Sequence, residues 1–130
     1  MAPEAGDLLV ADAEAWRRWL QARHASDEGV WVVLSKKGAQ APTCLTFDEA
    51  LAEALCYGWI DNKVRSRDAT TYRIRFRRRL PGGSWSPSNV RLAEALIAAG
   101  RMQPSGMVEV DRARADGRWK AARAGERTQR

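Results

Sequence analysis

A helix end followed at once by two alternating stretches constrains this fold more than any other part of the sequence. Thr46 and Glu49 form a capping-box pattern, which predicts a helix over about residues 47–57. Gly58 suits the left-handed position that ends such a helix. Residues 59–66 and 71–79 then alternate between apolar and charged side chains, as strands with one face on a core do. A turn at residues 67–70 would join them as a hairpin.

The alternation also predicts how the two strands pair. One register keeps the apolar side chains on the core side: Ile60, Val64, Ile74 and Phe76. This register sets Val64 opposite Ile74 and Asp61 opposite Arg77. It also sets two pairs of cations face to face, Lys63 with Arg75 and Arg65 with Arg73. Trp59 and Asp61 would then share the charged face.

The net charge of the chain is concentrated in this hairpin. The formal charge is +6, and residues 59–79 hold eight basic and two acidic side chains, which accounts for the whole excess. Like charges directly opposed across two strands destabilise the pair by roughly 0.2–1 kcal/mol. Guanidinium groups match the geometry of phosphate and carboxylate. The hairpin therefore predicts an anionic partner: a small molecule, a nucleic acid or an acidic protein surface. A solvated, solubilising face is the alternative.

The candidate binding residues come from the charged face and from the next helix start. They are Trp59, Asp61, Lys63, Arg65, Arg73, Arg75, Arg77, Trp85 and Ser86. The two tryptophans can stack on a base or an arginine, and the backbone donors at Ser86 can bind an anion. Each has a structural alternative: core positions for the tryptophans, an N-cap for Ser86 and an ion pair between Asp61 and Arg77.

Few catalytic chemistries fit the sequence. His24 is the single histidine, expected on an exposed helix flank, and one histidine builds neither a metal site nor a triad. Cys56 sits at a helix C-terminus, which disfavours a thiolate, and Cys44 has no activating neighbour. No P-loop, dinucleotide fingerprint, HExxH or GxSxG is present. We expect neither a metal nor a cofactor. The alternative is an enzyme that acts on a small anionic substrate. Asp61 would be its acid or base, Arg75 and Ser86 would hold the substrate, and these three groups would have to converge on one pocket.

The remaining patterns predict one α+β domain over residues 1–130, with a small, largely antiparallel sheet and helices packed on it. Residues 7–12 and 30–34 are predicted strands, the second buried on both faces. Predicted helices cover about residues 13–25, residues 87–99 after the Ser86-Pro87 start, and residues 104–115. Flexible ends are expected at residues 1–6 and about 120–130. Without a signal peptide or a long apolar run, the sequence predicts a cytoplasmic protein without a membrane span and leaves its oligomeric state open.

Several short motifs follow one another along roughly residues 10–120. They are Trp19-Leu20, Gly29-Val30-Trp31, Lys36-Lys37-Gly38, residues 53–61, Tyr72, Arg75-Phe76, Trp85-Ser86 with Asn89, Gly100-Arg101-Met102 with Pro104 and Gly106, and Gly117-Arg118-Trp119. With these motifs in this order, the chain resembles the YdeI/OmpD-associated family of small bacterial proteins, also labelled bacteriocin-protection proteins. The resemblance implies an α+β domain with a stress- or bacteriocin-resistance role, and it carries over no catalytic residue, ligand or cofactor. Asn62 and Arg77-Arg78 depart from the family pattern, and the second departure makes this strand more basic.

Overall fold

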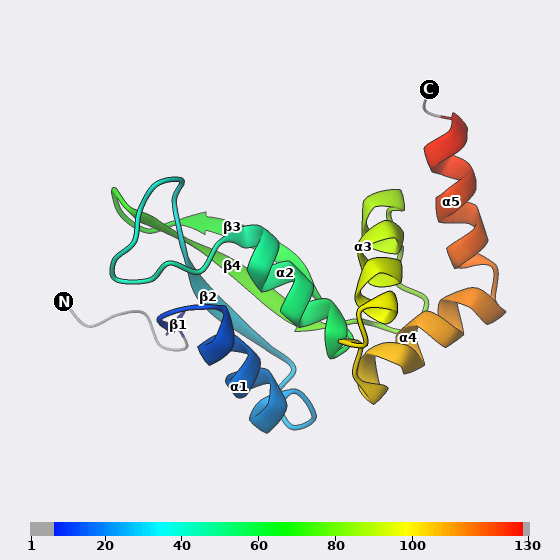
Figure 1. The fold of residues 1–130 in the computed structure, drawn as a ribbon, viewed down its shortest axis with the longest axis horizontal. Coiled ribbons are helices and arrows are strands. Elements are labelled where there is room, and N and C mark those ends of the chain that lie inside the picture. Colours follow the sequence, from blue (N-terminus) through cyan, green and yellow to red (C-terminus); the bar gives the residue numbers. More distant parts are fainter. Residues whose placement is uncertain (1–6, 129–130) are drawn as a thin grey trace.

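A four-stranded mixed sheet organises the fold, as the computed structural model of residues 7–128 shows (Figure 1). Its strand order is β1-β2-β4-β3, with β1 at Asp7–Leu8, β2 at Gly29–Ser35, β3 at Trp59–Ser66 and β4 at Thr71–Arg78. The short β1 pairs with β2 in parallel, whereas β2 with β4 and β3 with β4 are antiparallel. The predicted α+β class is confirmed, and the sheet is mixed.

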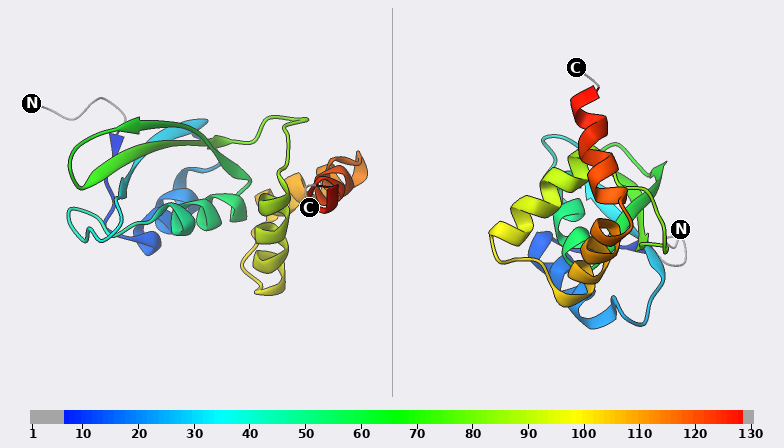
Figure 2. Two further views of the ribbon diagram at one scale, coloured as in Figure 1. Left: turned by 90° about the horizontal axis from the view of Figure 1, so that it is seen from above. Right: turned by 90° about the vertical axis from the view of Figure 1, so that its right-hand side faces the viewer.

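Two groups of helices flank this sheet. The left view of Figure 2 shows α1 (Ala13–Arg23) and α2 (Phe47–Cys56) on one face of the sheet. The other group lies beyond the end of the sheet and comprises α3 (Pro87–Ala98), α4 (Pro104–Ala115) and α5 (Arg118–Thr128). Within residues 7–128, no helix covers the opposite face of the sheet. None of the helices in this range is long and apolar enough to cross a membrane.

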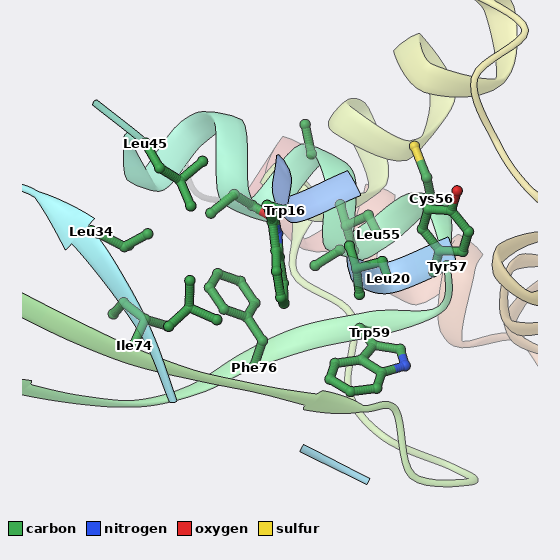
Figure 3. Packing of buried hydrophobic residues seen from close by; sticks show 14 of the residues in the cluster. Trp16, Leu20, Leu34, Leu45, Leu55, Cys56, Tyr57, Trp59, Ile74 and Phe76 are labelled. Atoms are coloured by element: carbon green, nitrogen blue, oxygen red, sulfur yellow. The ribbon is translucent and has the colours of Figure 1, made fainter. Parts of the chain in front are cut away.

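The main core lies between the sheet and the first two helices, and it is built around aromatic rings (Figure 3). Trp16 of α1 is fully buried, and its indole nitrogen donates a 3.0 Å hydrogen bond to the Ala50 carbonyl in α2. Its ring lies 5.4 Å from Trp19 and 5.5 Å from Phe76 of β4, measured between ring centroids. Offset and tilted pairs at such distances are favourable. The aromatic cluster therefore joins both helices to the hairpin.

A second core holds the three C-terminal helices together. It consists of Trp85, Val90, Ala93, Val110, Ala113, Trp119 and Ala122. Trp119 and Ala122 belong to α5, which continues as a helix through the segment from about residue 120 where the sequence predicts a flexible end. The sequence of α5 is mostly polar and basic, and its few apolar residues, Trp119 and Ala122, are recognised as a core-facing stripe only when α3 and α4 are in place. The other predicted flexible end, residues 1–6, lies outside the described residues.

The predicted helix starts are confirmed by their hydrogen bonds. The Asp12 carboxylate accepts from the Ala15 amide at 2.9 Å, and the Ser86 hydroxyl accepts from the Asn89 amide at 3.1 Å. Both bonds of the capping box at Thr46 are formed. Most predicted boundaries lie within one residue of those observed, and the larger differences are that α1 ends at Arg23 and that the first strand spans only residues 7–8.

Candidate functional site

The hairpin register matches the prediction near the turn and departs from it near the start of β3. Val64 lies opposite Ile74, Lys63 opposite Arg75 and Arg65 opposite Arg73, as predicted. A β-bulge between Asp61 and Lys63 then shifts the pairing, so that Asp61 lies opposite Phe76 and Ile60 opposite Arg77. The predicted pairing of Asp61 with Arg77 is therefore wrong. An extra residue in one strand reverses the sides of all residues that precede it.

One face of the sheet gathers most of the cations of the hairpin. We call it the outer face, and its residues include Asp7, Gly29, Trp31, Val33, Ile60, Lys63, Arg65, Arg73, Arg75 and Arg77. Ile60, predicted on the core side, lies opposite Arg77 because of the bulge. Trp31 and Lys63 flank Arg75 on the two neighbouring strands, and Val33 and Arg65 flank Arg73 in the same way. The outer face thus combines five cations with one carboxylate, and it is the face that no helix covers within residues 7–128 (Figure 2).

The cations of the outer face differ in how firmly they are held. Arg73 bonds the Asp7 carboxylate at 3.4 Å and the Ser66 carbonyl at 2.9 Å, and the Arg73 and Asp7 side chains are only 13% and 7% exposed. The Arg65 guanidinium lies 4.8 Å from the centre of the Trp31 ring, a cation–π distance. Arg73 is therefore part of the structure of the sheet, whereas Lys63 and Arg65 are exposed.

Arg75 extends along β2 over a glycine. A β-carbon added at Gly29 would lie 2.8 Å from Nη2 of Arg75. The missing side chain at Gly29 thus leaves the space that the guanidinium occupies. Arg75 and Arg77 are half-buried. Together with Lys63 and Arg65, they form the part of the outer face that can meet a ligand.

Four of the sequence-predicted site residues lie elsewhere. Trp59 is fully buried in the main core, where its indole nitrogen donates to the His24 carbonyl at 3.3 Å (Figure 3). The bulge turns it there, so its predicted place on the charged face is wrong. Asp61 is exposed and shares the side of Phe76. Trp85 is buried in the second core, and Ser86 caps α3. Asp61, Arg75 and Ser86 therefore do not converge as the proposed enzyme would require.

Trp31 is the aromatic residue of the outer face that the sequence analysis missed. The run of residues 30–34 predicts a strand buried on both faces, and Val32, Val33 and Leu34 are fully buried. Trp31 is only half-buried, because its ring lies on the helix-free side. Trp31 could have been placed on this face if the pairing of β2 with β4 had been known, because it lies directly opposite Arg75.

Two buried groups outside the outer face have shifted ionisation. Burial lowers the pKa of Arg79 to about 10, and its guanidinium lies 3.6 Å from the centre of the Trp85 ring. Burial, together with the nearby Glu53 carboxylate, raises the pKa of the Cys56 thiol to about 11. Both shifts are structural consequences of desolvation. The second supports the expectation that Cys56 is not a nucleophile.

The two cysteines are expected to react differently with thiol reagents. Cys44 is exposed, so a thiol reagent in solution can reach its sulfur. Buried Cys56 has a raised pKa and should remain unmodified in the native protein. Iodoacetamide followed by peptide mass spectrometry should therefore find one labelled site, and two sites after denaturation. Fast native labelling of Cys56 would contradict this assignment.

A buried carboxylate with two partly exposed arginines links three segments beside the main core. Glu53 of α2 is 3% exposed, and it accepts hydrogen bonds from Nε and Nη2 of Arg17 at 3.0 and 2.7 Å. Arg101, between α3 and α4, donates to the same carboxylate at 2.8 Å. The bond to Glu53 is the main cause that raises the pKa of Arg17 above its ordinary value. This cluster fixes the segment that leads into α4 against α1 and α2.

Comparison with known proteins gives one match. A family model described as a domain of unknown function (DUF8412) matches residues 8–109. The match runs from β1 into α4 and includes Trp31 and the whole β3–β4 hairpin. No curated protein and no solved structure matches the chain.

Proposed function

The chain belongs to the DUF8412 family, a domain of unknown function, and we propose that it binds a polyanionic partner on its outer face. The observation that carries this proposal is the charge of a helix-free sheet face, on which five cations meet one carboxylate. Two pairs of these cations lie directly opposite each other, at Lys63–Arg75 and Arg65–Arg73. Arg73 already has the Asp7 carboxylate beside it, so the cost of roughly 0.2–1 kcal/mol falls mainly on the Lys63–Arg75 pair. A bound anion removes that cost.

The arrangement favours a partner with repeated negative charges over one with a single charge. Arg73, Arg75 and Arg77 follow one another on the same side of β4, so their Cα atoms are spaced by about 6.8 Å. Lys63 and Arg65 form a second row on the neighbouring strand, about 4.8 Å away. Two parallel rows of cations match an extended chain of phosphates or carboxylates. The resemblance to the YdeI/OmpD-associated family extends the proposal to a cytoplasmic stress- or bacteriocin-resistance protein.

Single-stranded nucleic acid is the candidate that one further observation favours. Trp31 lies among the cations, and Arg65 covers its ring at 4.8 Å. Proteins that bind single strands combine a cationic surface with an aromatic ring on which bases stack. A base can replace the guanidinium over this ring or lie on the guanidinium itself. A simple polyphosphate lacks bases and gains nothing from Trp31.

The proposal is tested by removing two opposed cations. The variant Lys63→Gln with Arg75→Gln should bind a single-stranded oligothymidylate at least roughly tenfold more weakly in a fluorescence-anisotropy titration, since two charge-assisted contacts are lost. The slope of log K against log salt concentration should become shallower by about 1.4, because each neutralised phosphate on a single strand contributes about 0.7. Thermal stability should stay the same or rise, because an opposed cation pair is removed.

Matched variants separate this face from general basicity. Arg18→Gln with Lys120→Gln removes the same charge from exposed positions outside the outer face and should bind like the wild type. If bases stack on Trp31, the Trp31→Ala variant should lose more affinity for the oligonucleotide than for an inorganic polyphosphate. Equal losses in the outer-face and control variants would reject the proposed surface. Arg73 is unsuitable for this test, because its loss leaves the buried Asp7 carboxylate without its cation.

A further inference from the structure

A cavity of about 300 Å³ lies where the sheet meets the C-terminal helices. Its walls come from the end of α1, the turn between α2 and β3, the end of β4, and α4. The side chains that matter are His24, Tyr57, Arg78, Val108 and Glu109. Arg78 lies opposite Trp59 and therefore on the helix side of the sheet. The cavity is thus separate from the outer face.

His24 is held in one orientation at this cavity. Its Nδ1 lies 2.7 Å from the Leu20 carbonyl oxygen, which can only accept, so Nδ1 carries the proton. In the neutral ring, Nε2 is then an acceptor with a free lone pair. The imidazole also packs against the Tyr57 ring, with centroids 5.0 Å apart. His24 is half-buried, contrary to the exposed flank that the sequence predicts, and it lines the cavity.

The cavity carries one fixed positive and one fixed negative charge. Nη2 of Arg78 donates to the carbonyls of Ala25 and Asp27, at 2.9 Å each, so backbone oxygens hold this guanidinium in place. The Glu109 carboxylate bonds Nη1 of Arg112 at 3.1 Å, and its side chain is only 13% exposed. Arg78 and Glu109 therefore have different partners. A ligand with a carboxylate and an ammonium group can bind both.

Apolar surface lines the space between the charges. Val108 is 44% exposed although it is a large aliphatic residue, and it lines the cavity together with the Tyr57 ring. Mostly apolar walls with a few convergent polar groups are typical of small-molecule sites, and about 300 Å³ is the small end of their range. An exposed valine is expected at the rim of such a site.

From this arrangement we propose that the cavity binds a small zwitterion, namely an α-amino acid with an apolar side chain. The carboxylate lies against Arg78, and the ammonium group donates to Glu109 and to Nε2 of His24. The apolar side chain packs on Tyr57 and Val108. Arg78 attracts only the carboxylate and Glu109 only the ammonium group, which disfavours ligands that carry only one of these charges.

Calorimetry with the free amino acids at millimolar concentration tests the proposal. Phenylalanine, leucine and methionine should bind. Their N-acetyl derivatives, which lack the ammonium group, and their amides, which lack the carboxylate, should bind roughly tenfold more weakly or worse. No heat with any free amino acid, or equal binding of the N-acetyl derivatives, would overturn the assignment.

Variants of the cavity complete the test. Glu109→Gln should lower the affinity roughly tenfold, and Val108→Trp should fill the cavity and abolish binding. Glu14→Gln is the matched control, because Glu14 pairs with Arg18 on one helix much as Glu109 pairs with Arg112. The outer-face variant Lys63→Gln with Arg75→Gln should bind amino acids normally, so failure of either proposal is seen separately. Loss of binding in the Glu14 control, or full affinity in Val108→Trp, would place the ligand elsewhere.

Discussion

Replacing Arg17 and Arg101 together by methionine is expected to lower the free energy of unfolding by about 2–3 kcal/mol, less than for a fully buried ion pair because both arginine side chains are nearly half exposed. The two arginines are the cations that bond Glu53, and Glu53 is 3% exposed. Methionine is chosen because its side chain keeps covering the carboxylate, so that water does not simply replace the lost bonds. A buried carboxylate without a partner carries the full desolvation cost. Urea denaturation followed by tryptophan fluorescence measures the loss.

Adding Glu53→Gln to that variant should recover most of the lost stability. A neutral amide in the same place removes the uncompensated charge, and replacing all members of a buried ion cluster is often nearly neutral. Arg18→Met is the control, because Arg18 and Glu14 form an exposed ion pair that contributes at most about 1 kcal/mol. A loss in the double variant no larger than in this control would show that Glu53 does not depend on the two cations.

Replacing Gly106 by alanine is expected to destabilise the fold by about 2–3 kcal/mol, the range of an overpacked core. Gly106 lies in the first turn of α4, and a β-carbon there would come within 2.3 Å of the Cys56 carbonyl oxygen and 2.5 Å of the Met102 sulfur. The methionine can move. The carbonyl cannot, because it belongs to the end of α2 and accepts the Gln103 amide at 3.0 Å. α4 must therefore shift away from α2.

The sign of this effect is what makes the experiment informative. Helix propensity alone favours alanine over glycine by about 1 kcal/mol, so a helix without this contact would be stabilised. Gly38→Ala is a useful comparison, because Gly38 has a φ of +85° but open space around it. It should lose only about 1 kcal/mol for the backbone conformation. A stabilised Gly106→Ala variant in thermal unfolding would show that α4 does not approach α2 as closely as described.

The local patterns of the sequence predicted most elements correctly. Asp12, Thr46 and Ser86 mark helix starts because a cap requires only a side-chain oxygen and an amide three residues later. Lys63 and Arg75, like Arg65 and Arg73, were placed opposite each other because alternation with period two leaves few registers. These features depend on neighbours in the chain or across one turn. They could be predicted without knowing the rest of the fold.

The sites depended on contacts that no local pattern shows. The cavity needs His24, Tyr57, Arg78 and Glu109 from four separate segments. The ion cluster needs Arg17, Glu53 and Arg101 from three. Helix α5 was missed because its apolar stripe is meaningful only against the second core. Such features depend on packing between distant segments, and this packing cannot be predicted from the local patterns of a single sequence.

The hairpin combines features that follow from local sequence patterns with one that follows from tertiary packing. Alternation with period two is enough to predict two strands, at residues 59–66 and 71–78, whose cations gather mainly on one face. The bulge after Asp61, which turns Trp59 into the core, depends on packing against distant segments. Burying that indole beside Trp19, at 5.7 Å between ring centroids, outweighs one irregular position in the ladder. The outer face therefore has Trp31 as its aromatic residue in place of Trp59.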